Sequence, residues 1–103
     1  MEIDKILEER GSRYGDYDEV ALVSQNIKSA MRHSRNWQHL PADMKESLEM
    51  TANKLARLLN GDWTYTDNLT DAIGYLTLVV DRLERCQNGP PDVNDQNQTE
   101  NGN

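Results

Sequence analysis

The chain has 103 residues, the size of a single domain, and 18 acidic against 11 basic residues give it a formal net charge of −7. Clustered Lys and Arg drive binding to duplex nucleic acid, so this acidity argues against that class of partner. The single Cys86 excludes an internal disulfide, and no segment approaches the roughly 20 apolar residues that a membrane span requires.

Hydrophobic periodicity predicts an all-α body of four helices with no strand. The first two helices are predicted at about 3–10 and 18–34, with a turn at 13–16 between them. After a helical domain of residues 1–87, the segment 88–103 has Val93 as its one apolar residue besides two prolines. Such a segment buries too little surface to offset the entropy of ordering, so we expect a disordered tail.

The third and fourth helices are predicted to be the two long antiparallel central helices of a four-helix arrangement. Pro41 suits the first turn of the third, which runs to about residue 60 with Gly61 as its stop. Thr66 or Asp67 caps the fourth helix, which reaches about residue 85. Its main apolar face is predicted to consist of Leu69, Ala72, Ile73, Leu76, Val79, Val80 and Leu83.

The fourth helix carries a second stripe, well away from that apolar face at 100° per residue. The stripe consists of Asp67, Asp71, Tyr75, Leu78 and Arg82. A fully solvated face would need neither Tyr75 nor Leu78, so we expect the helix to be covered on two sides. The cover is a second subunit in a homo-oligomer, or else the first or second helix of a monomer.

Four carboxylates are candidate metal ligands. Glu46 and Glu49 are three residues apart on the third helix, and Asp67 and Asp71 are four apart on the fourth. Hard oxygen ligands of this kind suit Mg²⁺ or Mn²⁺. Each also has a structural interpretation. Glu46 could be solvated, Glu49 ion-paired, Asp67 a helix cap, and Asp71 the partner of Lys54 or Arg57.

Two cations and one turn are candidate binding groups for a phosphorylated ligand. Lys54 and Arg57 would bind phosphate, Arg through a bidentate fork and Lys as a point charge, or would simply balance the acidic cluster. Tyr14 and Asp16 could close over the site from their turn, although a plain structural turn is the alternative.

Three motifs resemble a family of small phage and prophage proteins. They are Tyr14-Gly15-Asp16, Lys54-x-x-Arg57-x-x-x-Gly61 and Asp67-x-x-x-Asp71-x-x-Gly74-Tyr75. That family is distantly similar to the all-α nucleotide pyrophosphohydrolases of the MazG and dUTPase type, whose E-E-x-x-E and E-x-x-D motifs bind Mg²⁺. Glu46-x-x-Glu49 and Asn68-x-x-Asp71 match parts of these motifs, with Lys45 and Asn68 where the enzymes carry Glu.

The resemblance implies a MazG-like fold and a cytoplasmic location in a bacterial host. It also implies that Mg²⁺-activated water attacks a nucleoside triphosphate, with Glu46 and Glu49 as catalytic residues and Asp71 completing the metal site. Asp67 is a further candidate ligand that would compensate for Asn68. The alternatives are a non-catalytic phage accessory protein that binds a host protein or sequesters a nucleotide, and a purely structural helical module.

Overall fold

The computed structural model describes residues 2–88, and these residues contain α-helices, one short 3₁₀-helix and no strand. The elements are α1 (Glu2–Tyr14), α2 (Tyr17–Arg32), the 3₁₀-helix η1 (Trp37–His39), α3 (Ala42–Asn60) and α4 (Asp67–Asn88). The prediction of an all-α body with four helices is therefore confirmed. The predicted tail lies outside the described residues, except for Asn88, which ends α4. No helix in the described part is long and apolar enough to cross a membrane.

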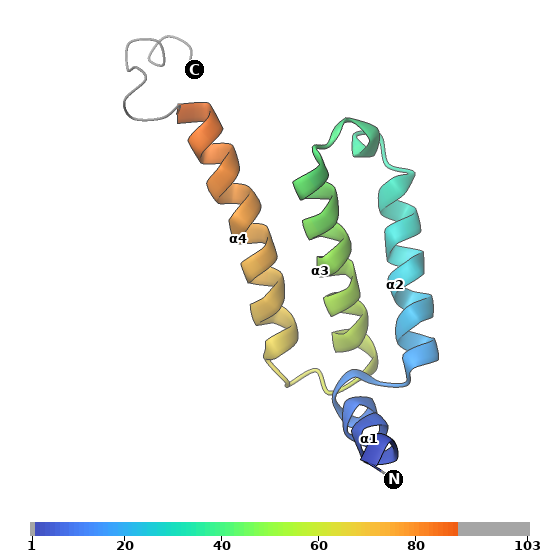
Figure 1. Cartoon of the computed structure of the whole chain (residues 1–103). Helices are drawn as coiled ribbons and strands as arrows, with labels where there is room; N and C mark the ends of the chain where they lie inside the picture. The colour runs from blue at the N-terminus through green and yellow to red at the C-terminus, as the bar shows by residue number, and fades with distance from the viewer. Residues whose placement is uncertain (1, 89–103) are drawn as a thin grey trace.

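Three of the helices form a single layer. Figure 1 shows α2, α3 and α4 side by side, with α3 in the middle and successive helices running in opposite directions. The short α1 lies at the end of this layer where α3 stops and α2 starts. The layer buries only small apolar side chains, namely Val20, Ala52, Ala56, Ala72 and Val79. In the described residues, therefore, no second layer of helices covers either broad face of this one.

The first helix is longer than predicted. It was expected to end at Arg10, but α1 continues through Gly11 to Tyr14, so that part of the predicted turn is helical. A single Gly costs a helix only about 1 kcal/mol relative to Ala, and this cost is small enough for α1 to continue through Gly11. The helix stops at Gly15, whose φ of +86° is left-handed and whose N–H donates to the carbonyl of Gly11 at 2.9 Å.

Two glycines allow the end of α1 to cross the end of α3 in backbone contact. A Cβ on Gly15 would lie 2.1 Å from the carbonyl oxygen of Asn60, and a Cβ on Gly61 would lie 2.3 Å from that of Arg13. The N–H of Asp62 donates to the same Arg13 carbonyl at 2.9 Å. Gly61 does follow the last residue of α3, as predicted, but its φ of −127° is open to any residue. Its role is the close approach of the two chain segments.

The predicted apolar face of α4 is wrong in part. Asn68, Ala72 and Val79 are the buried residues of this helix, while Leu69, Ile73, Leu76 and Val80 are between 38% and 64% exposed. The reason is that α3 is the main neighbour of α4, so only one narrow line of α4 residues is covered by another helix. The opposite end of this contact is held by Arg82, which donates two hydrogen bonds to the carboxylate of Asp43.

We predict that Gly61→Ala destabilises the protein by about 1–3 kcal/mol, because a methyl group cannot fit against the Arg13 carbonyl. Urea unfolding followed by circular dichroism measures the change. Gly74→Ala is the matched control, since a Cβ there meets nothing within 4 Å. In the control, α4 should gain about 0.5–1 kcal/mol from the higher helix propensity of Ala. Equal effects of the two substitutions would contradict the crossing.

A second prediction concerns pH. The hydrogen bonds from Arg82 hold the pKa of the Asp43 carboxyl below its ordinary value of 3.8. A pKa lowered by folding contributes stability above the unfolded value, and that contribution is lost as the pH falls through the folded value. Asp43→Asn should therefore be less stable than the wild type at about pH 7 and converge with it below about pH 3.

The control for this pH series is Asp81→Asn, which removes an exposed ion pair to Arg85 one turn along α4. This variant should differ little from the wild type at either pH. A carboxyl titration by NMR that places the pKa of Asp43 at or above 3.8 would refute the prediction.

Candidate functional site

One pocket of about 300 Å³ lies between α1, α2 and α3, beside the glycine crossing. It brings together three of the four residues predicted to bind substrate, namely Tyr14, Asp16 and Arg57. The full lining is Leu7, Arg10, Gly11, Tyr14, Gly15, Asp16, Tyr17, Val20, Asn53 and Arg57. The volume is at the lower end of the range for small-molecule sites.

Two guanidinium groups lie against the ring of Tyr14. The guanidinium carbon of Arg57 is 4.8 Å from the ring centroid, and that of Arg10 is 5.3 Å from it. Both distances are within cation–π range. Neither arginine forms an ion pair with a carboxylate in the part of the chain that the structure describes. Their positive charge is therefore held by an aromatic ring and left available to an anion.

A second tyrosine supports the first from outside the pocket. The rings of Tyr14 and Tyr65 meet edge to face with centroids 6.0 Å apart, and Arg13 lies 4.9 Å above the Tyr65 ring. The Tyr65 hydroxyl donates to the carboxylate of Asp67 at 2.8 Å, and this hydrogen bond raises the pKa of Tyr65. Tyr14 is thus fixed from three sides, by two arginines and one ring.

Lys54 points to the other side of α3, away from this pocket. Its Nζ lies 2.9 Å from the carboxylate of Asp71 on α4, and the Lys54 side chain is only 14% exposed. The structural alternative for Asp71, an ion pair with Lys54, is therefore the arrangement in this structure. Lys54 and Arg57 are only three residues apart, but Lys54 pairs with Asp71 on α4 whereas Arg57 lies in the pocket against Tyr14.

The four predicted metal ligands do not converge. Arg32 donates to Glu49 at 3.0 Å, Asp71 pairs with Lys54, and Asp67 accepts the hydrogen bond from Tyr65. Glu46 is exposed on α3. Among the described residues, no group of three or more His, Cys, Asp or Glu is placed to hold a metal ion. The residues present therefore do not fit the Mg²⁺ or Mn²⁺ site expected from the resemblance, and its ligand set stays a prediction.

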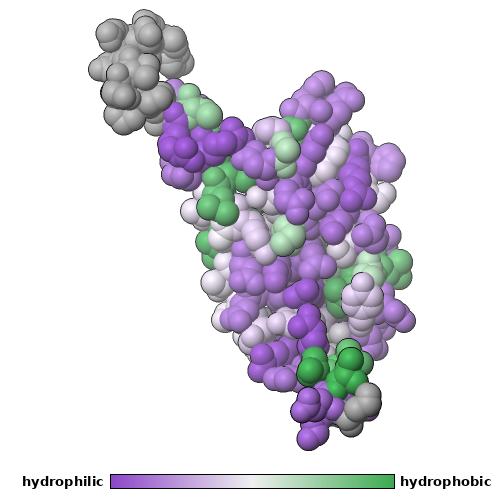
Figure 2. Space-filling view, viewed as in Figure 1, coloured by the Kyte–Doolittle hydropathy of each residue, from purple (hydrophilic) through white to green (hydrophobic). Residues whose placement is uncertain are grey.

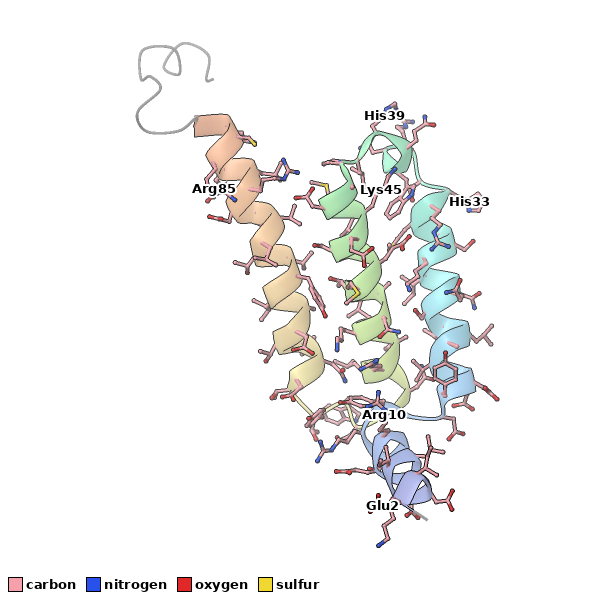
Figure 3. The ribbon with its side chains drawn as sticks, in the orientation of Figure 1. Glu2, Arg10, His33, His39, Lys45 and Arg85 are labelled. Carbon is pink, nitrogen blue, oxygen red and sulfur yellow. The ribbon has the colours of Figure 1, made fainter. Side chains whose placement is uncertain are left out.

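The two positions where the resembling enzymes carry Glu have other roles here. The ammonium group of Lys45 lies 5.9 Å from the ring centroid of Trp37 (Figure 3). Asn68 is 2% exposed in the buried line of α4, and its Nδ2 has no hydrogen-bond partner within residues 2–88. Neither residue contributes to an acidic cluster.

Sequence reasoning missed both Arg10 and Asn53 as pocket residues. Arg10 and Tyr14 are four residues apart, a spacing that brings two side chains together on a helix. That signal was lost because the first helix was predicted to end at Arg10 itself. Asn53 and Arg57 show the same spacing on α3, so α1 and α3 each place a pair of polar side chains, one turn apart, in the pocket lining.

Comparison of the chain with protein-family models, with curated proteins and with solved structures finds no match.

We predict that Asp71→Asn destabilises the protein by about 0.5–1 kcal/mol, because the mostly buried Lys54 loses its partner. A double-mutant cycle with Lys54→Met, read by urea unfolding, isolates the pair from other effects of each change. A metal role for Asp71 would show differently. Wild-type protein would then give Mn²⁺ broadening of NMR signals around Asp71, and Asp71→Asn would abolish it without loss of stability.

Proposed function

We propose that this protein binds a phosphorylated small molecule of the nucleotide class in the pocket beside Tyr14. The observation that carries the proposal is the pair of arginines, Arg10 and Arg57, which face this pocket without an ion pair in the described structure. Five of the eleven Lys and Arg side chains form ion pairs with carboxylates in the described structure, and these two arginines are not among them. Two guanidinium groups held on one aromatic ring form a site for an external anion.

The chemistry of the remaining lining suits the rest of such a ligand. Guanidinium groups bind phosphate oxygens through two parallel hydrogen bonds. Asp16 offers carboxylate oxygens that accept hydrogen bonds from hydroxyl or amino groups, and Asn53 both donates and accepts. A ligand that combines phosphate with hydroxyl and amino donors fits this set, and a nucleotide is such a ligand.

We propose binding without hydrolysis. A protein that binds a nucleotide in this way also sequesters it. Hydrolysis of the MazG type would require several carboxylates around one cation, whereas here Glu49 and Asp71 are engaged in ion pairs. In this proposal Mg²⁺ reaches the pocket bound to the triphosphate, as the counterion of its phosphate groups, and is not held by protein carboxylates. The MazG-like assignment and the phage origin stay predictions from the motifs.

We predict that Arg57→Gln weakens the binding of a deoxynucleoside triphosphate at least about tenfold, since a bidentate phosphate contact is lost. Isothermal titration with a panel of four deoxynucleoside triphosphates, inorganic triphosphate and the matching nucleosides measures the effect. Arg85→Gln is the matched control, because Arg85 lies toward the far end of α4 and pairs only with Asp81 within the described chain (Figure 3).

Three results decide the proposal. Binding of the triphosphates that Arg57→Gln weakens and Arg85→Gln preserves supports it. No binding by any probe, or equal loss in both variants, overturns it. Release of pyrophosphate by the wild-type protein in Mg²⁺, abolished by Glu49→Gln, would replace simple binding with the hydrolysis that the resemblance implies.

A further inference from the structure

The two flanks of α4 differ completely in chemistry. Ala72 is buried against α3, and its two neighbours in sequence are rotated about 100° to either side of it. Asp71 on one flank forms the ion pair with Lys54, whereas Ile73 on the other flank is 64% exposed. The buried Val79 repeats this arrangement one heptad later, with Leu78 on the Asp71 flank and Val80 on the Ile73 flank.

α3 also has one flank with a charged residue and one apolar flank. Lys54 meets Asp71 on one flank, and Leu55, one residue further and rotated by about 100°, lies on the other. Leu59 follows Leu55 by one turn, and both are exposed. Exposed apolar residues on adjacent flanks of the two helices thus form one surface, which we call the apolar face. It consists of Leu55, Leu59, Leu69, Ile73, Leu76 and Val80.

The side turned toward the reader in Figure 2 is largely hydrophilic over α2 and α3. In the orientation of Figure 1, with α4 to the left of α3, the right-handed turn of the helices places the apolar face away from the reader. The layer therefore has one polar and one apolar broad side.

The spacing along both helices is that of a coiled-coil seam. On α4 the apolar positions follow at intervals of four, three, four and three residues, and α3 repeats the same intervals with Thr51 at its centre. The two sets are Leu69, Ile73, Leu76, Val80 and Leu83 on α4, and Met44, Leu48, Thr51, Leu55 and Leu58 on α3. A heptad seam is typical of helices that pack against other helices over their length, and here much of the seam faces solvent.

Charge and size favour a second copy of this chain as the occupant. No seam position on either helix is charged, so a partner recognised through opposite charge would find nothing to pair with here. Each copy has a net charge of −7, and a contact made by uncharged residues keeps these like charges at the rim of the interface. The two seams extend over about 20 Å, and two adjacent helices are about 20 Å wide. Such a surface covers about 400 Å² when measured flat, and the relief of its side chains raises the accessible area toward the roughly 800 Å² per partner of a standard interface.

We propose that two chains pack their apolar faces together, so that two α3–α4 hairpins complete a four-helix bundle about a twofold axis. The bundle supplies the second layer that the single chain lacks, and it buries leucines and isoleucines where one chain buries mainly alanines and valines. The polar side, with the Tyr14 pocket, stays outside this contact. The proposal therefore does not depend on the ligand.

The test compares two substitutions on one helix. Ile73 and Leu78 are exposed to nearly the same extent, 64% and 68%, but lie on opposite flanks of α4. Sedimentation velocity of the full chain should give a dimer for the wild type and for Leu78→Glu, and a monomer for Ile73→Glu. Helix content by circular dichroism accompanies each run, and Leu69→Lys provides a second break of the same face should Ile73→Glu unfold.

Two outcomes overturn the proposal. The first is a wild type that remains monomeric at concentrations near 1 mM, well above the dissociation constant of a standard interface. In that case a second copy does not cover the apolar face, and a different protein is its partner. A dimer that survives both Ile73→Glu and Leu69→Lys but is broken by Leu78→Glu moves the contact to the stripe of Asp71, Tyr75 and Leu78, which the sequence had favoured.

Discussion

The close crossing of two backbone segments organises the base of this protein. Gly15 lies against Asn60 and Gly61 against Arg13, at distances that leave no room for a Cβ on either glycine. This contact holds α1 across the end of α3, and in doing so it places Arg10 and Tyr14 of one helix beside Asn53 and Arg57 of the other. The pocket therefore depends on the crossing, which, together with the contacts that Arg13 and Tyr14 make with Tyr65, ties α1 to the end of α3 and the loop that follows it.

Ion pairs across the layer explain why the acidic residues do not assemble a metal centre. Arg32 on α2 meets Glu49 on α3, and on the other side of α3 Lys54 meets Asp71 and Arg82 meets Asp43. Each carboxylate is thereby matched to a cation on a neighbouring helix, which offsets the cost of bringing it out of water. Arg10 and Arg57 form no ion pair in this part of the chain, and both face the pocket.

The single layer explains the uneven distribution of apolar residues. A helix with one neighbour buries one line of side chains, and α4 uses Asn68, Ala72 and Val79 for that line. Small or polar residues along that line allow α4 to approach α3 closely, and the larger apolar residues are displaced to the flank. An apolar flank with heptad spacing on two adjacent helices is the pattern of a hairpin that packs on another hairpin.

Local patterns in the sequence determined that the described residues are helical and where three of the four helices lie to within a few residues. They also grouped Tyr14, Asp16 and Arg57, which line one pocket in the structure. Helical periodicity reports which residues share a face, and turn chemistry reports where a helix ends. Neither reports which face meets which neighbour. The tertiary structure alone decided that Asp71 pairs with Lys54, that the carboxylates stay apart, and that Ile73 lies outside the core. Those outcomes depend on the order of helices in the layer and on the rotation of each about its axis, which are set by long-range packing and not by any segment by itself.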